Sequence, residues 1–539
     1  MLPSRVAGYT SGVVFLASPG TDVDSMRCRP LDSSRRDFLS RAFAGAAAAV
    51  ASVDRTAGGT AGAAEVPAAA GRATGPADRL RVAVIGVNGQ GRAHVASWLA
   101  QPDCDLVAIC DCDPAASTRL MAWLEKPLGT TGPGGAVFTR RPDPPPEFVK
   151  DVRKLFERRD IDAVSIATPN HTHAILSILA MQSGKDVYVE KPCSHDLAEG
   201  REMVRWARKL GRICQMGAQS RSMAGMRQLL EFLGRGGIGK ITVAQALCYN
   251  PRPSIGLVDT PAPVPKGLDL DLWCGPAALA VPLRRKFHYD WHWTHLTGNG
   301  DIGNQNPHEL DKARWGLGKR TLPHRVMSLG GRLGYVDNAD TANSQVTVFQ
   351  WDDCTLISDV RGLPVKPVPR FAPAGPPVLV GNVWHGSEGF AVSSDYVSGA
   401  AFGHDGEPLG AWKGGQTADH FANFVQAVRS RNPADLHLDI EDAHLSSGLA
   451  HLANISLALG EETAAGARLP LGSDVRQVVE TLDTFHEHLA GHEIDYATTK
   501  LRLGRQLAID AATERTGDAA VDRLFARERR AGWELPPAS

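Results

Sequence analysis

Residues 81–91 read Arg-Val-Ala-Val-Ile-Gly-Val-Asn-Gly-Gln-Gly, and this stretch decides the fold of the first half of the chain. Its apolar part, 82–85, is rich in β-branched side chains, which is typical of a buried parallel strand. A glycine-rich turn follows, and then a segment of helical pattern at 93–100. A glycine turn between strand and helix lets the backbone approach a diphosphate, which the helix N-terminus attracts. The stretch predicts a phosphate-binding turn, with a tight turn that binds nothing as the alternative.

The glycine spacing departs from the usual dinucleotide-binding pattern at one position. Gly86, Gly89 and Gly91 are present, but Asn88 stands where a middle glycine is usual. Asparagine tolerates a left-handed backbone better than most residues, so the turn can form. We take these four residues and Arg92 as candidate cofactor-binding residues.

A second apolar run, 106–110, ends at Asp111, 25 residues after Gly86. A carboxylate at that strand end accepts hydrogen bonds from ribose hydroxyls and repels a 2′-phosphate, so it favours NAD over NADP. The alternative is that Asp111 caps the helix expected after Asp113-Pro114.

Strands and helices then alternate along the chain, which predicts a doubly wound parallel sheet. We expect a surface insertion in the Gly- and Pro-rich stretch 129–146. The expected strands are 162–168, 186–190 and 212–217, and the expected helices are 147–158, 171–183 and 195–210.

Two of these strands end in polar clusters, at the sheet edge where ligands of open α/β sheets bind. One reads Thr168-Pro-Asn170-His171-Thr-His173 and the other Glu190-Lys191-Pro192. Together with the glycine turn they resemble the Gfo/Idh/MocA oxidoreductases, over about residues 79–460. The resemblance implies a Rossmann domain followed by an α+β domain, with NAD as cofactor.

The resemblance also implies roles for single residues. Lys191 would point at the substrate carbinol beside the nicotinamide. Together with Thr168, Asn170, His173 and Glu190 it would also line the cofactor site. A lysine in such a partly desolvated site has a lowered pKa and can relay protons. For Asn170, a helix N-cap is the alternative.

A downstream motif at 298–311 differs from the family pattern D-x-G-x-H-x-x-D. Asp301 and Gly303 match, but Gln305 stands at the histidine and His308 at the closing aspartate. Glutamine can bind a sugar hydroxyl but cannot exchange a proton near neutral pH. His308, one helical turn on, is therefore the candidate acid/base, or else it satisfies the start of helix 308–316.

Aromatic and histidine residues at 287–295 directly precede this motif, and aromatic faces commonly bind sugar rings. The alternative is that several of them fill an ordinary core layer. The candidate substrate-binding residues are Lys191, His295, Asn304, Gln305 and His308, of which Lys191 and His308 are the catalytic candidates.

The second half has strand-like runs without crossover helices between most of them, which predicts a largely antiparallel open sheet in an α+β domain. The expected division is 1–78 signal and linker, 79–216 NAD(P)-binding Rossmann domain, 217–499 substrate and oligomerisation domain, and 500–539 C-terminal tail. That tail mixes charged residues with Leu, Phe and Trp, and a terminal helix packed on the body or on another subunit is expected. Homo-oligomerisation is expected from the resemblance alone.

Ser33-Ser34-Arg35-Arg36-Asp37-Phe38-Leu39 precedes an Ala-rich stretch and resembles a twin-arginine export signal, with Met26 as the expected initiator. An exposed basic turn is the alternative. Because that route carries folded proteins, we expect a cofactor enzyme acting in the periplasm or otherwise outside the inner membrane.

Composition excludes other classes. The net charge of -1 gives no broad attraction to nucleic acid, and the body of the chain has no apolar run of roughly 18 residues that would span a membrane. The nine cysteines show no C-x-x-C pair, so we expect no metal site.

These observations predict an NAD-dependent oxidoreductase that moves a hydride between nicotinamide and a sugar or cyclitol hydroxyl. Lys191 would polarise the oxygen and His308 would handle the proton. One alternative is an NAD-dependent glycosidase, which oxidises a hydroxyl, eliminates the aglycone, adds water and reduces again. A second is a carbohydrate-binding protein without activity.

Overall fold

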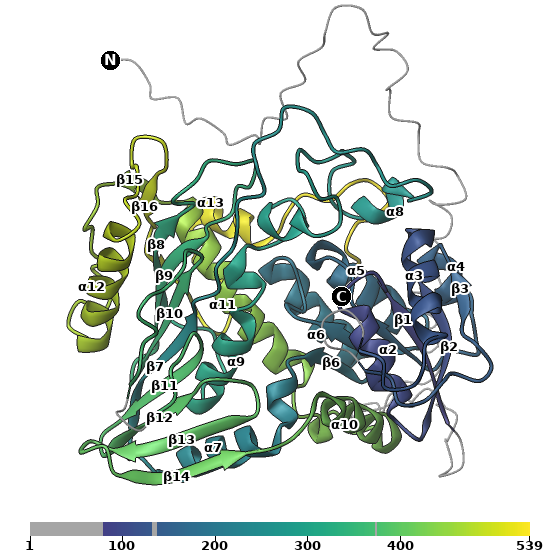
Figure 1. Ribbon diagram of the computed structural model, residues 1–539, viewed down its shortest axis with the longest axis horizontal. Coiled ribbons are helices and arrows are strands. Elements are labelled where there is room, and N and C mark those ends of the chain that lie inside the picture. The colour runs from purple at the N-terminus through teal and green to yellow at the C-terminus, as the bar shows by residue number, and fades with distance from the viewer. Residues whose placement is uncertain (1–78, 132–136, 372–374, 539) are drawn as a thin grey trace, which may run out of the picture.

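A computed structural model describes residues 79–131, 137–371 and 375–538, which form two sheets and the helices around them (Figure 1). The expected export signal, its linker and Met26 lie outside these residues. Within them, no helix is both long and apolar enough to cross a membrane.

The first sheet has six parallel strands in the order β3-β2-β1-β4-β5-β6. The order reverses between β1 and β4, and ligands of such sheets bind at this reversal, outside the carboxyl ends of the strands. This confirms the doubly wound Rossmann sheet. The strands are β1 (Leu80–Ile85), β2 (Cys104–Cys110), β3 (Glu147–Val149), β4 (Ala163–Ile166), β5 (Asp186–Glu190) and β6 (Cys214–Gly217). The helices are α2 (Gly91–Leu99), α3 (Pro114–Leu124), α4 (Val152–Glu157), α5 (Asn170–Gln182) and α6 (Leu197–Leu210).

One expectation for this half is wrong. The segment 147–158 is not a single helix, because residues 147–149 pair with β2 as the edge strand β3. Helix α4 starts only at Val152, where the Asp151 carboxylate accepts a hydrogen bond from the backbone of Arg153 and so caps the helix. A three-residue edge strand is too short to show an alternating pattern.

The second sheet has eleven strands in the order β14-β13-β12-β11-β7-β10-β9-β8-β16-β15, with β17 paired to β8. Its described ladders are antiparallel except the parallel pair β7–β10, which confirms the largely antiparallel second sheet. The strands are β7 (Ile241–Cys248), β8 (Arg325–Gly331), β9 (Ser344–Gln350), β10 (Thr355–Arg361), β11 (Val380–Gly386), β12 (Gly389–Ser393), β13 (Ser398–Gly403), β14 (Pro408–Lys413), β15 (Glu461–Thr463), β16 (Leu501–Leu503) and β17 (Leu507–Ala508).

Helices lie on both faces of this sheet (Figure 1). On the face toward the first domain lie α7 (Ala224–Gly234), α9 (Pro307–Gly316) and α11 (Ile440–Ala458). On the opposite face, α12 (Arg476–Ala490) packs on β8–β10, so part of the expected open face is covered. The other α-helices of the described residues are α8 (Leu270–Cys274), α10 (Thr417–Ser430) and α13 (Ala519–Asp522), and the short 3-10 turns include Asp301–Gly303.

Two late segments return to the first domain. In α10, the Phe421 ring stacks on Tyr188 of β5 at 4.4 Å between centroids. The C-terminal tail buries Trp533 in the core of the first domain, and the Trp206 indole donates a hydrogen bond to the Pro536 carbonyl. The tail therefore packs on the body, and its regular parts are the short strands β16 and β17 and the short α13 rather than a long terminal helix.

Candidate active site

The glycine turn is closed on its inner side and open on its outer side. Gly86 has φ +83°, and a Cβ there would lie 2.8 Å from the Ala167 carbonyl oxygen. A Cβ on Gly91 would lie 1.8 Å from the Gly86 carbonyl oxygen, whereas one on Gly89 would meet nothing within 4 Å. The backbone at Gly89 is thus free to be approached closely, which fits a diphosphate.

Asp111 ties this turn to the end of β2. One carboxylate oxygen accepts from the Val87 amide and the other from the Asp113 amide, both at 2.9 Å. Burial raises its pKa to about 6, against the two backbone hydrogen bonds. Helix α3 is capped by Asp113, so Asp111 is not its cap and keeps lone pairs for ribose hydroxyls.

Two arginines contact the glycine turn. The Arg119 guanidinium donates to the Asn88 side chain at 2.7 Å, and Arg92 donates to the Val87 carbonyl at 3.3 Å. Asn88 is thus held within the turn, with φ outside the left-handed region that glycine favours.

Lys191 and His308 come from different halves of the chain and lie near enough to interact electrostatically at the carboxyl edge of the first sheet. The Lys191 ammonium, at the end of β5, donates to the Asn304 carbonyl at 2.6 Å. Burial lowers its pKa, although the charges of Glu190 and Glu309 oppose this shift. His308 lies in the first turn of α9, and burial followed by the charge of Lys191 lowers its pKa to about 3. Its imidazole is therefore neutral at pH 7, and its Nδ1 has no hydrogen-bond partner among the described residues.

The polar cluster after β4 positions the site. The two ring nitrogens of His173 lie 2.7 Å from the carbonyls of Thr168 and Pro192, so the ring clamps both strand ends and has no nitrogen left for a ligand. The Asn170 amide donates to the Asn299 side chain at 3.0 Å. Helix α5 starts at Asn170 without a side-chain cap, so the N-cap interpretation of that residue is wrong.

Glu190 supports Lys191. Its carboxylate lies 2.9 Å from the His94 ring and 3.1 Å from the Lys191 amide. Burial opposes its ionisation, but the hydrogen bond from His94 and the neighbouring positive charges outweigh burial and lower its pKa to about 2. The carboxylate is committed to these partners.

Gln305 is bound to residues that the sequence did not single out. Its side-chain amide donates to the Tyr396 hydroxyl at 2.6 Å and lies 3.4 Å from Glu309. The Tyr396 ring is 4.9 Å from the His308 ring, and the Lys312 ammonium lies over it. Burial raises the pKa of Glu309 to about 7. The spacing of Glu309 and Lys312, three residues apart on one helix, could have indicated from the sequence that they face the same site. No pattern in the sequence around Tyr396 indicates that it belongs there.

The aromatic segment divides between core and surface. Phe287 and Trp293 are buried, while Tyr289 is half exposed and Trp291 and His292 are partly exposed. Asp301 is buried and paired with Arg252, whose guanidinium lies 5.2 Å from the Trp293 ring.

His295 is exposed, and its backbone amide donates to Asp340 at 2.7 Å. Among the described contacts, none brings its side chain to Lys191. The structure therefore does not join His295 to the other four candidate substrate-binding residues.

A long connection, residues 264–297, crosses in front of the glycine turn. Its Asp269 amide donates to the Cys112 carbonyl at 3.0 Å, at the end of β2. At its other end, the Thr297 carbonyl lies 3.2 Å from the ring of His171, at the start of α5. Because β1 lies between β2 and β4, this connection runs past the carboxyl end of β1, where the sheet order reverses.

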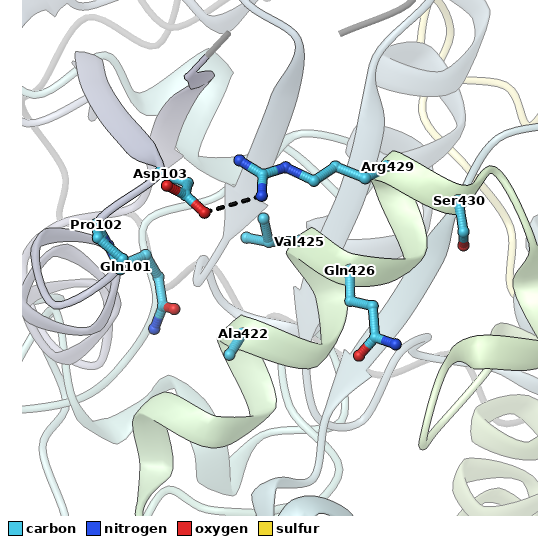
Figure 2. A pocket seen from close by; sticks show the side chains of 8 residues that line it. All are labelled: Gln101, Pro102, Asp103, Ala422, Val425, Gln426, Arg429 and Ser430. Carbon is cyan, nitrogen blue, oxygen red and sulfur yellow. Dashed lines mark hydrogen bonds and ion pairs between the residues drawn. The ribbon is translucent and has the colours of Figure 1, made fainter. Parts of the chain in front are cut away.

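A surface hollow of about 600 Å³ lies between the start of β2 and α10, and the 2.8 Å ion pair between Arg429 and Asp103 crosses it (Figure 2). It opens near the amino end of β2, whereas the candidate site lies at the carboxyl ends of the strands. It is therefore not part of that site. Its lining residues are Gln101, Pro102, Asp103, Ala422, Val425, Gln426, Arg429 and Ser430. Within the described residues, no group of three or more His, Cys, Asp or Glu side chains is arranged to hold a metal.

Residues 80–218 match the family model described as "Oxidoreductase family, NAD-binding Rossmann fold", GFO_IDH_MocA. The matched segment is about a quarter of the chain and coincides with the parallel sheet of the first domain. A glycosyl hydrolase family 109 protein of Shewanella sp. (strain W3-18-1) is 33% identical over 141 residues. The matched part is 26% of this chain and 28% of the relative's length, so the likeness is confined to a part of each protein.

Solved structures resemble more of the chain. A protein described as an NADPH-dependent oxidoreductase from Desulfitobacterium hafniense superposes with a TM-score of 0.51 at 14% identity, covering 71% of this chain and 96% of its own. The WlbA dehydrogenase from Bordetella pertussis, solved with NADH and UDP-GlcNAcA, gives a TM-score of 0.48 at 17% identity, with coverage of 69% and 94%. Because the Desulfitobacterium hafniense protein is only 14% identical to this chain, its likeness shows a shared fold alone.

Proposed function

We propose that this chain, whose residues 80–218 form an NAD-binding Rossmann domain, is an NAD-dependent oxidoreductase acting on a secondary hydroxyl of a sugar or cyclitol. The observation that carries the proposal is the proximity of Lys191 and His308 at the carboxyl edge of the first sheet. An amine and a neutral imidazole there, next to the glycine turn, suit an alcohol oxygen that loses or gains a proton.

The cofactor site fits a dinucleotide. The open backbone at Gly89 would take the diphosphate, and the Asp111 carboxylate would accept the ribose hydroxyls. When bound, the nicotinamide would accept a hydride from the carbinol carbon, so the alcohol yields a ketone and one proton.

The two catalytic candidates divide the proton chemistry. With a pKa of about 3, His308 holds a proton poorly and acts as a hydrogen-bond partner that orients the hydroxyl. Lys191, with its pKa lowered by burial, is the better acceptor of the hydroxyl proton during oxidation. In the reverse direction the ammonium would return that proton to the carbonyl oxygen.

Exposed aromatic side chains support a carbohydrate substrate. Tyr289 is half exposed, and the rings of Trp291 and His292 stack at 3.6 Å and are partly exposed. We propose that they form a platform for a sugar ring. The twin arginines at 35–36 lead us to propose action outside the inner membrane.

The test begins with protein purified without added cofactor, denatured and analysed for released dinucleotide by mass. The protein is then incubated with NAD and a panel of sugars and cyclitols, and NADH and ketone are measured together. The proposal expects equal amounts of both, and their loss in Lys191→Met. If neither NAD nor NADP is released or bound on titration, the proposal is wrong.

A redox-neutral glycosidase is the second candidate, and two observations favour it. The match to glycosyl hydrolase family 109 proteins covers the NAD-binding part. The connection 264–297 runs past the carboxyl end of β1 and is fastened by the tail, where Arg530 donates to the Gly275 carbonyl at 2.8 Å. A cofactor bound beneath this connection would exchange slowly, which suits a reaction cycle that regenerates the cofactor. A new reducing sugar with unchanged NAD would support this candidate over the dehydrogenase.

A further inference from the structure

Tyr396 belongs to the candidate site but has no role in the proton chemistry above. It follows β12, far in sequence from both Lys191 and His308. Its hydroxyl is bound to Gln305, and the Lys191 ammonium is bound to the preceding residue, Asn304. Two adjacent residues of one chain segment therefore bind the polar ends of Tyr396 and Lys191.

The orientation of the Gln305 amide is fixed by its neighbours. Its NH₂ group faces the Tyr396 oxygen at 2.6 Å and the Glu309 carboxylate at 3.4 Å. A carboxylate oxygen attracts the NH₂ group and repels the carbonyl oxygen, so the opposite assignment is disfavoured. The Gln305 carbonyl oxygen consequently points away from Glu309, and no described residue donates to it.

The Tyr396 hydroxyl keeps its own proton for another partner. It accepts from Gln305, and its described hydrogen bonds include no acceptor for the phenolic proton. Burial and the charge of Glu309 raise the pKa of this phenol above its ordinary value, so it stays protonated. Together, the Tyr396 hydroxyl and the Gln305 carbonyl offer one donor and one acceptor, which is the complement of an alcohol.

The backbone around Tyr396 is held firmly. The Lys312 ammonium donates to the Asp395 carbonyl at 3.1 Å, and the Ser220 hydroxyl donates to the Tyr396 carbonyl at 3.2 Å. Side chains positioned in advance lose little entropy on binding and discriminate well between ligands. Both Tyr396 and Gln305 are partly exposed, so a ligand can reach them.

We propose that Tyr396 and Gln305 bind a second hydroxyl of the substrate, on the carbon next to the one that Lys191 serves. The substrate class is then a vicinal diol within a ring, as in sugars and cyclitols. Tyr396 is a specificity-determining residue, and a substrate lacking the second hydroxyl leaves its donor and the Gln305 acceptor unpaired. This inference rests on the proposed function, because it requires oxidation at the neighbouring carbon.

The test compares substrates that differ by one hydroxyl. The smallest probes are cyclohexane-1,2-diol, as separate cis and trans isomers, and cyclohexanol, with NADH formation followed by absorbance. Each active sugar from the panel is compared in the same way with its deoxy analogue. We expect kcat/KM for the better diol isomer to exceed that for cyclohexanol by about 100-fold or more, since an unpaired buried polar group rejects the deoxy analogue.

Tyr396→Phe removes only the hydroxyl. We expect it to lower kcat/KM for the diol about 10- to 100-fold while leaving cyclohexanol nearly unchanged, so the ratio collapses. Tyr496→Phe, in the apolar layer beside α12, is the matched control and should keep the wild-type ratio. Thermal unfolding and NAD titration of both variants show whether folding or cofactor binding has changed.

The outcomes separate this inference from the proposed function. If the wild type oxidises diol and cyclohexanol equally well, or if Tyr396→Phe slows both in parallel, the second-hydroxyl role is wrong. If the wild type binds no dinucleotide and oxidises neither the probes nor any sugar, the proposed function itself fails.

Discussion

The first sheet and helix α9 place their site residues in opposite surroundings. The strands of the first sheet are mostly apolar, and the candidate site residues Asp111 and Lys191 follow their carboxyl ends, where both are partly exposed. Helix α9 instead buries a row of charged side chains that includes Glu309, Asp311 and Lys312. In the first region, apolar packing stabilises the fold, and the site residues lie at its edge. In the second region, the same buried charges both stabilise the fold and line the site.

The largest effect on activity is expected when Lys191, at the edge of the first sheet, is replaced. Replacing Lys191 by Met deletes the ammonium, yet the apolar strands that carry it remain packed. We expect kcat to fall about 100- to 10,000-fold, the range that a positioned proton-transfer group contributes. NAD affinity and the unfolding midpoint should stay near wild type, as measured by titration and thermal scanning. A folded Lys191→Met enzyme with a near-normal kcat would show that Lys191 does not take part.

The dependence of the reaction rate on pH is a second test of the role of Lys191. Because burial lowers the pKa of Lys191, its neutral form is available at lower pH than for an exposed lysine. Oxidation should therefore rise with pH through that lowered pKa and level off at a lower pH than an exposed lysine would give, while reduction should fall over the same range.

The contrast explains what the sequence could predict. The β-branched runs and the glycine turn are local signals, so the parallel sheet and the cofactor edge could be located residue by residue. His173 and Glu190 were placed at this edge, but their partners, the Pro192 carbonyl and His94, were not foreseen. Such pairings depend on how strand ends are brought together.

The second half gave weaker signals. Its sheet type was predicted, but the parallel pair β7–β10 joins segments more than a hundred residues apart, and no local pattern reveals such a pairing. Tyr396 reaches the site from the end of an ordinary strand, and Gln305 is informative only once Tyr396 is beside it. The burial of the α9 charges was not predicted, because their partners, such as Arg221, lie far away in sequence.

Loss of one charge in helix α9 should destabilise the protein much more than loss of the Lys191 charge at the edge of the first sheet. The Asp311 carboxylate is paired with the Arg221 guanidinium at 2.7 and 2.8 Å, and both side chains are buried. Asp311→Asn leaves Arg221 as a buried cation without its counter-ion, so we expect a loss of about 3–5 kcal/mol in unfolding free energy, measured by urea titration. The double variant Arg221→Met with Asp311→Leu should recover most of this loss. No loss in the single variant would mean that water reaches the pair.

The glycine turn separates folding from binding within the first region. Gly91→Ala forces a Cβ to 1.8 Å from the Gly86 carbonyl, so we expect a destabilisation of about 2 kcal/mol and loss of dinucleotide binding. Gly89→Ala meets no protein atom within 4 Å and should fold normally. Its methyl group would still obstruct the diphosphate and raise the Kd for NAD about tenfold or more. Equal NAD affinity in Gly89→Ala and wild type would place the diphosphate elsewhere.

The smallest expected effect is on the pH dependence of stability, and it arises because His308 is neutral in the folded protein. Its folded-state pKa is about 3, whereas a histidine in the unfolded chain titrates near 6.5. Between these values the unfolded state binds more protons, so His308 makes stability fall as pH drops from about 6.5 toward 3. One such group contributes a slope of about 1.4 kcal/mol per pH unit in this window.

His308→Gln should therefore flatten the dependence of unfolding free energy on pH by about one proton, as measured by urea titration between pH 6.5 and 4.5. His404→Gln, an exposed surface change, serves as the control and should keep the wild-type slope. If both variants keep that slope, His308 is reached by water and is protonated as readily as in the unfolded chain. It would then be able to store a proton, and the division of work between His308 and Lys191 would have to be reversed.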